Sequence, residues 1–194
     1  KAITERGSER VIRHSFDLAR RRDQKRKVTV TCKYNMLSTA DGLFLETAKR
    51  VANDYPDIAF EHFIVDDFLC RMIAQPEELD VIVTPNLYGD ILSDGAAGMM
   101  GGLGLAPSGC YGDDYAYFES AHGTAPDIAG QNIINPTATL LSAAMMLDYL
   151  NLREAALRLR HAVRSVYSEG RTLPRDQGGT ASTDAFCEAV RSLL

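Results

Sequence analysis

The chain has 194 residues, of which 45% are hydrophobic and 24% are charged, the composition of an ordinary globular protein. Its formal net charge of −5 argues against a nucleic-acid-binding protein, because such proteins carry a basic face. No apolar run approaches the ~20 residues that span a bilayer, so we expect no membrane segment.

The cysteines and the first residue bear on the compartment. Four cysteines are far apart in the sequence and form no CxxC pair, which excludes the usual zinc spacing and a disulfide framework. No secretory signal opens the chain. We therefore expect a cytoplasmic protein, with an organellar matrix as the alternative, because the chain begins at Lys1 and a targeting segment could have been removed.

Helices and strands are predicted in turn along the first half of the chain. Ser8 is a suitable N-cap for a helix that carries Ile12 and Phe16 on one face. Residues 27–34 alternate and are rich in valine and threonine, as in a strand. The segments that follow are a helix at 42–53, a strand at 58–65, a helix at 66–74 and a buried strand at 79–84. This alternation predicts an α/β architecture.

The second half is predicted to be mostly helical, with helices at 89–100, 135–150, 152–168 and 183–193. A strand is expected before His122, and a glycine-rich loop at 101–108. These glycines do not form a dinucleotide-binding fingerprint, because Pro107 stands where the third glycine is needed. We find no internal repeat and expect two lobes, about 1–85 and 86–194.

The stretch from Asn86 to Asp94 holds two carboxylates four residues apart. On a helix, Asp90 and Asp94 project from one face, where they repel each other unless a cation lies beside them. Oxygen ligands of this kind suit Mg²⁺ or Mn²⁺. The alternative is that both are solvated acids on a helix surface.

Lys33 and Asp66 each follow a predicted strand. Polar groups at the ends of adjacent α/β elements are where binding sites are usually built. Lys33 is flanked by Cys32 and Tyr34, so it is either partly desolvated, which would suit it to act as a base, or exposed to solvent.

A compact, turn-forming segment, His122 to Gly130, lies between the expected strand and the helix at 135–150. It combines one imidazole, one carboxylate and two glycines, so backbone N–H groups can approach a ligand closely. The helix that starts beyond it favours anionic groups.

These stretches belong to a longer series of motifs, which in chain order are Gly7–Arg10, Cys32–Asn35, Asp41–Phe44, Tyr55–Pro56, Ile64–Asp66, Asn86–Asp94, Gly101–Gly104 and His122–Pro136. The series resembles the β-decarboxylating hydroxyacid dehydrogenases, the isocitrate and isopropylmalate dehydrogenase family. The resemblance implies an α/β fold of the isopropylmalate dehydrogenase type rather than a Rossmann fold, represented by the dimerisation lobe and part of the large lobe. Relatives place about as many residues again before the position of Lys1, including the substrate-binding arginines and a catalytic tyrosine. We therefore expect the chain to be inactive alone.

The resemblance also implies roles for individual residues. Lys33 resembles the catalytic lysine of the family, and Asn35 its neighbouring contact to substrate or nicotinamide. The three metal-binding aspartates of the family correspond to Asp66, Asp90 and Asp94. Asp66 is also a catalytic candidate. Lys33 and Asp66 would reach across the interface of a homodimer with shared active sites. The cofactor loop corresponds to His122, Gly123, Thr124, Ala125, Asp127, Ile128 and Asn135, with Glu119 as a further candidate.

The reaction that the resemblance implies is hydride transfer from a 2-hydroxy acid to NAD, with Mg²⁺ or Mn²⁺, followed by loss of the 3-carboxylate as CO₂. Gly101–Gly104 and His122–Thr124 resemble isocitrate or homoisocitrate enzymes more than isopropylmalate enzymes, and isopropylmalate, malate or tartrate stays the alternative substrate. NAD is expected rather than NADP, because Asp127 can accept hydrogen bonds from the ribose hydroxyls and repels a 2′-phosphate. The alternative of another class is a non-catalytic regulatory or truncated subunit, against which the three retained aspartates argue.

Overall fold

The computed structural model describes residues 2–194, and the chain divides into two compact units, residues 1–96 and 97–194. The lobe boundary expected after residue 85 stays a prediction. In the part of the chain that the structure describes, no helix is long and apolar enough to cross a membrane.

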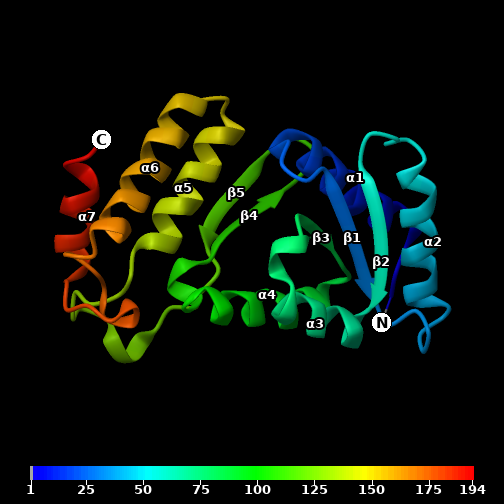
Figure 1. Cartoon of the computed structure of the whole chain (residues 1–194), viewed down its shortest axis with the longest axis horizontal. Helices are drawn as coiled ribbons and strands as arrows, with labels where there is room; N and C mark the ends of the chain where they lie inside the picture. Colours follow the sequence, from blue (N-terminus) through cyan, green and yellow to red (C-terminus); the bar gives the residue numbers. More distant parts are fainter. Residues whose placement is uncertain (1) are drawn as a thin grey trace. The chain divides into compact units, whose positions relative to one another are not determined.

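The first unit is built on a parallel sheet of three strands in the order β2–β1–β3 (Figure 1). The strands are β1 (Lys27–Cys32), β2 (Ala59–Ile64) and β3 (Val81–Val83). Cys32 pairs with Ile64, so the carboxyl ends of β1 and β2 lie side by side. The residues that follow these two strands are therefore neighbours in space.

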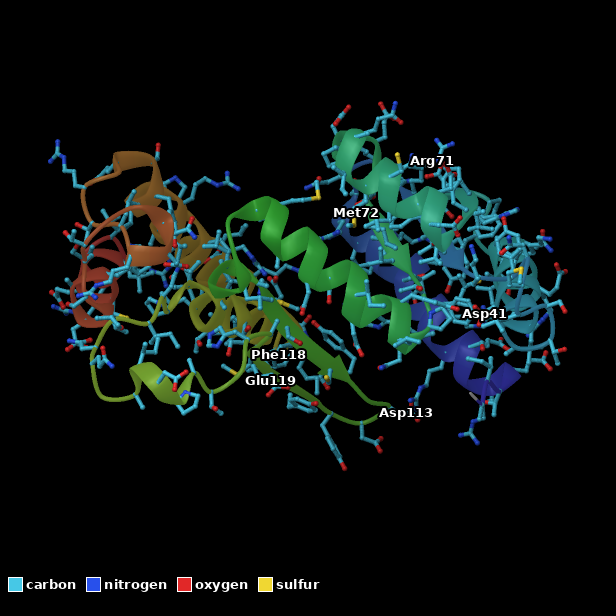
Figure 2. The ribbon with its side chains drawn as sticks, turned by 90° about the horizontal axis from the view of Figure 1, so that it is seen from below. Asp41, Arg71, Met72, Asp113, Phe118 and Glu119 are labelled. Atoms are coloured by element: carbon cyan, nitrogen blue, oxygen red, sulfur yellow. The ribbon has the colours of Figure 1, made fainter. Side chains whose placement is uncertain are left out.

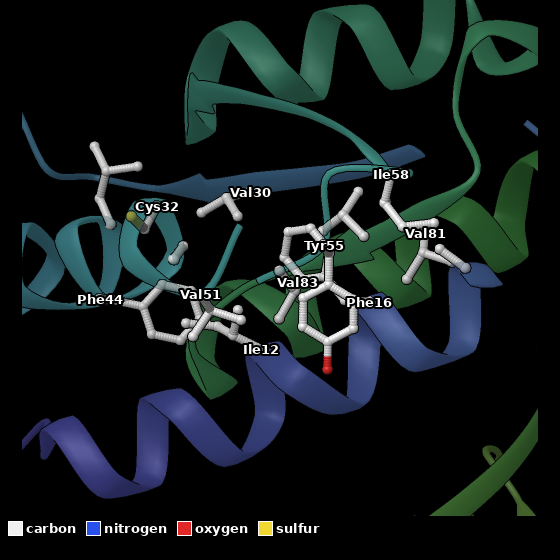
Figure 3. Packing of buried hydrophobic residues seen from close by; sticks show 14 residues of the cluster. Ile12, Phe16, Val30, Cys32, Phe44, Val51, Tyr55, Ile58, Val81 and Val83 are labelled. Carbon is white, nitrogen blue, oxygen red and sulfur yellow. The ribbon is translucent and has the colours of Figure 1, made fainter. Parts of the chain in front are cut away.

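Helices cover both faces of this sheet, as expected for strands that are buried on both sides. Their bounds are α1 (Glu5–Arg22), α2 (Ala40–Ala52), α3 (Val65–Ala74), η1 (Pro76–Glu78) and α4 (Asn86–Met100), which runs on into the second unit. Figure 3 shows Phe16 of α1 and Phe44 of α2 in the apolar cluster that also includes Val30 of β1. Phe68 of α3 and Leu92 of α4 belong to a second cluster. Burial of each such side chain stabilises the fold by ~1.5–3 kcal/mol.

Two predicted boundaries in this unit are wrong. Helix α1 begins before Ser8, because the Thr4 side chain accepts a hydrogen bond from the Gly7 backbone N–H at 3.2 Å and caps the helix there. Ser8 is instead buried, and its hydroxyl donates to the Thr4 carbonyl at 2.9 Å. Strand β1 ends at Cys32 rather than at residue 34, so Lys33 lies just beyond the sheet. The other predicted elements of the first half are present with shifted ends.

The second unit packs three helices in series on a two-stranded antiparallel sheet. Helix α5 contacts both strands, α6 packs on α5, and α7 packs on α6. The elements are η2 (Leu103–Leu105), β4 (Pro107–Tyr111), β5 (Ala116–Ser120), η3 (Pro126–Ile128), α5 (Thr137–Tyr149), α6 (Arg153–Glu169), η4 (Arg175–Gln177) and α7 (Thr183–Arg191). Phe186 and Val166 lie in the apolar core between the helices.

The strand expected before His122 is confirmed as β5, which carries Phe118 and Glu119 (Figure 2). The loop predicted at 101–108 is wrong at its end, because β4 begins at Pro107. A Cβ atom on Gly109 would lie 3.0 Å from the ring of Phe118, its partner on β5. Glycine at this position therefore leaves room for the ring while the two strands pair. Pairing with β5 therefore decides the structure here over the weak strand propensity of the segment.

Candidate functional site

In the first unit, Lys33 and Asp66 form an ion pair at the carboxyl edge of the sheet. Lys33 follows β1 and Asp66 follows β2, and the register of these strands brings the two residues together. The Lys33 Nζ donates a hydrogen bond to Asp66 Oδ1. This bond lowers the pKa of the Asp66 carboxyl from its ordinary value. The Lys33 side chain is 29% exposed and that of Asp66 60%, so the pair is open to a ligand.

A buried carboxylate, to which the sequence analysis gave no role beyond its place in the motif Asp41–Phe44, holds the backbone at Lys33. The Lys33 N–H donates to Asp41 Oδ2 at 2.8 Å, and the Tyr88 hydroxyl donates to the same oxygen at 2.9 Å. Asp41 is 0% exposed and lies in the first turn of α2, where the helix terminus favours negative charge. Burial, together with the hydrogen bond to Asp41, raises the pKa of Tyr88 to about 12. Only the position of Asp41 at a helix start hinted at this role in the sequence.

The carboxylates of helix α4 provide oxygen ligands on an exposed surface. Asp90 and Asp94 lie one helical turn apart, as predicted, and both are exposed. The side-chain amide of Asn86 donates to Asp90 Oδ2 at 3.0 Å. Hard oxygen donors of this type match the preference of Mg²⁺ and Mn²⁺, so the residues present fit such an ion.

A single chain does not bring the three metal-binding candidates together. Within residues 2–194, no group of three or more His, Cys, Asp or Glu side chains is placed to hold a metal ion. Asp66 forms an ion pair with Lys33 and is not grouped with Asp90 or Asp94. Asn35 is exposed in the turn after Lys33. That Asp66 meets the carboxylates of α4 across a dimer interface stays a prediction.

In the second unit, much of the predicted cofactor loop lines a cavity of about 470 Å³. The lining includes the predicted residues His122, Gly123, Ala125, Ile128 and Asn135. It also includes residues to which the sequence analysis gave no cofactor role, namely Gly104, Ile133, Ile134, Arg175 and Asp176. A concave site with few, convergent polar groups is the usual form of a small-molecule site.

The loop itself has a tight backbone and one unpaired imidazole nitrogen. Ala125 has a φ of 45° and Gly130 a φ of 75°, so the chain turns twice through the left-handed region. His122 Nδ1 lies 2.9 Å from the Gly123 carbonyl, which can only accept, so Nδ1 carries the hydrogen. In the neutral ring Nε2 is then an acceptor, and it is buried without a partner among the described residues. A donor on a ligand would satisfy it.

Asn135 has its side chain committed to the protein. It is 4% exposed, and its Nδ2 donates to the Tyr167 hydroxyl at 3.2 Å and to Asp176 Oδ2 at 3.0 Å. Its Oδ1 accepts from the Thr137 backbone N–H at 3.0 Å at the start of α5. Asn135 therefore shapes the cavity wall, and its partner Asp176 is 41 residues away, too far for a sequence pattern to find.

The remaining loop candidates lie outside this cavity. Thr124 lines an adjoining hollow with Asn132 and Thr183. Asp127 is exposed, and its backbone carbonyl accepts from the Gln131 side chain at 2.9 Å. Glu119 is exposed on β5 (Figure 2). This hydrogen bond goes to the backbone of Asp127 and not to its carboxylate. The role of the Asp127 carboxylate toward a cofactor stays a prediction.

Comparisons with known proteins converge on one family. A family model described as isocitrate/isopropylmalate dehydrogenase matches residues 1–190. The chain is 52% identical over 192 residues to an isocitrate/homoisocitrate dehydrogenase of Thermus thermophilus, covering 99% of this chain and 57% of the relative. It is 48% identical over 193 residues to a 3-isopropylmalate/3-methylmalate dehydrogenase of Methanocaldococcus jannaschii, covering 98% and 58%. A probable mitochondrial NAD isocitrate dehydrogenase alpha subunit of Caenorhabditis elegans is 47% identical over 197 residues, with 100% and 55% covered.

A solved structure agrees with these sequences. The crystal structure of isocitrate dehydrogenase from Methylococcus capsulatus superposes with a TM-score of 0.94 at 46% identity, covering 99% of this chain and 57% of that one. The α/β fold is therefore that of isocitrate dehydrogenase. The chain spans about half the length of the curated relatives that it matches.

Proposed function

Since the chain belongs to the isocitrate/isopropylmalate dehydrogenase family, we propose that it forms the C-terminal part of an enzyme that oxidises and decarboxylates a 2-hydroxy acid with NAD. The observation that carries the proposal is the Lys33–Asp66 ion pair at the carboxyl edge of the sheet. Asp90 and Asp94 add oxygen ligands on a helix of the same unit. Such a set supplies a proton acceptor and ligands for a divalent ion, as the reaction needs.

Lys33 is the proposed proton acceptor. Acting as the neutral amine, with its ammonium proton first released to solvent, it would take the hydroxyl proton of the substrate, directly or through a water, as the C2 hydride passes to the nicotinamide. Asp66 holds the amine of Lys33 at the sheet edge through their hydrogen bond. Asn35, exposed two residues further on, is proposed to contact the substrate or the nicotinamide.

Asp66, Asp90 and Asp94 are proposed to hold Mg²⁺ or Mn²⁺. A divalent ion bound there would stabilise negative charge on the substrate oxygen during oxidation and on the ketone oxygen during decarboxylation. The low pKa of Asp66 suits this role, because a metal ligand must be ionised. Asp90 and Asp94 are exposed to solvent, so burial does not disfavour their negative charge.

The cavity of the second unit is the proposed NAD site. His122 offers an acceptor nitrogen, and the turn from Gly123 to Ile128 offers a compact backbone. Asp127 is proposed to accept hydrogen bonds from the adenosine ribose hydroxyls, which favours NAD over NADP. Thr124, Asn135 and Glu119 are proposed as further contacts, Asn135 through its backbone because its amide is already bonded.

A homodimer would complete the metal site. The outer surfaces of α3 and α4 carry apolar side chains that are 38% to 60% exposed, namely Leu69, Ile73, Leu87 and Ile91. Apolar residues exposed one helical turn apart on two helices are typical of a protein interface. We propose that a second copy covers them and that Lys33 and Asp66 of one subunit meet Asp90 and Asp94 of the other.

Isocitrate or homoisocitrate is the proposed substrate, with isopropylmalate as the alternative. The Thermus relative is named for the first two, and the Methanocaldococcus relative for 3-isopropylmalate. The compartment stays between cytoplasm and organellar matrix, since several relatives are named as mitochondrial.

Turnover and metal binding of the full-length enzyme test the proposal. Isocitrate, homoisocitrate, isopropylmalate, malate and tartrate would be assayed with NAD and Mn²⁺. Calorimetric titration should show that Asp90→Asn weakens Mn²⁺ binding far more than NAD binding. Equal Mn²⁺ affinities, or no turnover of any of these acids, would contradict the proposed function.

A further inference from the structure

Asp41 is a fully buried carboxylate that joins two elements of the proposed active site. Its Oδ2 accepts from the Lys33 backbone N–H at 2.8 Å, just beyond the end of β1. The same oxygen accepts from the Tyr88 hydroxyl at 2.9 Å, in the first turn of α4 and 47 residues away in sequence. Figure 2 labels Asp41 in the first unit. One oxygen atom of Asp41 thus holds both the backbone at Lys33 and the start of α4, the helix that carries Asp90 and Asp94.

Burial of this group needs a reason beyond packing. Removing a carboxylate from water is costly unless hydrogen bonds satisfy it, and an apolar side chain of similar volume usually packs at least as well. Asp41 is followed one helical turn later by the buried residues Phe44 and Leu45, and the thiol of buried Cys32 donates to the Asp41 backbone carbonyl at 3.5 Å. An apolar residue at this position would remove the oxygen that accepts from the Lys33 N–H and from the Tyr88 hydroxyl.

We propose that Asp41 is a positioning residue, which sets the place of Lys33 and the direction in which Asp90 and Asp94 project. This inference rests on the proposed function, because it matters only if Lys33 and the α4 carboxylates take part in the reaction. In the proposed dimer these groups serve different active sites, so Asp41 would link the two sites through one chain.

Variants of the full-length enzyme separate positioning from simple stability. Asp41→Ala removes the acceptor, Asp41→Asn keeps one acceptor oxygen, and Tyr88→Phe removes only the hydroxyl. Thr47→Ala is the control for a buried polar group of α2, since the Thr47 hydroxyl bonds to its own helix at Leu43. Tyr55→Phe is the control for a phenol hydroxyl, which in Tyr55 donates to Asp17 at 3.0 Å.

The expected losses are specific. Asp41→Ala should lower kcat and weaken Mn²⁺ binding each by about 10- to 100-fold, as removal of groups that orient metal ligands and catalytic residues usually does. KM for NAD should change less than Mn²⁺ affinity, because the proposed cofactor loop belongs to the second unit and Asp41 to the first. Asp41→Asn should recover part of both losses. Tyr88→Phe should weaken Mn²⁺ binding and, at saturating Mn²⁺, keep kcat near that of the wild type.

Hydrogen exchange at the Lys33 backbone amide reports on its hydrogen bond to Asp41 and needs no activity measurement. Exchange should be faster in Asp41→Ala than in the wild type, and unchanged in Thr47→Ala and Tyr55→Phe. If Asp41→Ala does not fold, Asp41→Asn carries the same comparison of kcat, Mn²⁺ affinity and amide exchange, and Tyr88→Phe carries the comparison of Mn²⁺ affinity. Folded Asp41 variants with wild-type kcat and Mn²⁺ affinity, or equal losses in Thr47→Ala, would overturn the inference and leave the proposed function standing. A wild-type enzyme without turnover and without Mn²⁺ binding would overturn both.

Discussion

Gly104→Ala is expected to damage the proposed NAD cavity. A Cβ atom at this position would lie 2.8 Å from Asp176 Oδ2 and 3.1 Å from Asn135 Cβ, where ordinary van der Waals contact begins at 3.4 Å. Asp176 cannot move freely, because its Oδ2 accepts from Asn135 Nδ2 at 3.0 Å and from Gln177 Nε2 at 3.2 Å. The methyl group must therefore displace the residues that line the cavity at this point or break these hydrogen bonds.

The size of the effect follows from this crowding. Placing an extra methyl group in a well-packed site costs about 1–3 kcal/mol. Part of this cost should appear as lower thermal stability. The rest should appear as weaker NAD binding, since the cavity lined by Gly104, Asn135 and Asp176 changes shape. A loss of only 1 kcal/mol in binding corresponds to a roughly 5-fold higher Kd.

Calorimetric titration with NAD and thermal unfolding, at one fixed protein concentration, measure both parts. Gly98→Ala is the matched control, because a Cβ atom there meets nothing within 4 Å. Gly98 lies within helix α4, where alanine should raise stability by roughly 0.5–1 kcal/mol. A Gly104→Ala protein that binds NAD and unfolds like the wild type would refute the reasoning about this wall.

Three further predictions concern the chemistry. Lys33→Met should lower kcat of the full-length enzyme by about 10²- to 10⁴-fold, as expected on loss of a general base, whereas Lys49→Met on α2 should not change it. Because the Lys33 hydrogen bond lowers the folded-state pKa of Asp66, its contribution to stability is present above the unfolded pKa and is lost as the pH falls through the folded pKa. In Lys33→Met the pKa of Asp66 should rise toward its ordinary value, and a carbon NMR titration of the Asp66 carboxyl that shows no rise would contradict the ion pair. Asp127→Lys with Ile128→Tyr should shift kcat/KM from NAD toward NADP, and a wild-type enzyme that already prefers NADP would contradict the role of Asp127.

The sequence predicts well those features that depend on local patterns. Alternating segments such as 27–34 mark strands, and the helices between them follow from apolar periodicity, so the α/β class is confirmed. The placement of Lys33 and Asp66 after strands indicated one edge of a sheet, and the parallel register of β1 and β2 brings them together. The family also follows from ordered motifs, and the match over residues 1–190 confirms it.

Features that depend on distant contacts were not predictable in this way. Asp41 looks like any acid in the first turn of a helix, and only the approach of Tyr88 from the start of α4 makes it a shared acceptor. Asp176 reaches Asn135 only because the fold of the second unit brings η4 beside the cofactor loop. Residues 107–111 have weak strand propensity, and their partner β5 supplies the pairing that makes them a strand.

The central claim is that Lys33 of one subunit works with Asp90 of the other, and mixed dimers test it most directly. Lys33→Met and Asp90→Asn subunits carrying different affinity tags would be co-expressed and the heterodimer isolated. Shared sites predict that each mutant homodimer is inactive, whereas the heterodimer has one intact site and about half the wild-type kcat per dimer. A heterodimer as inactive as the two homodimers would contradict the account, because it would place Lys33 and Asp90 of the same chain in one site.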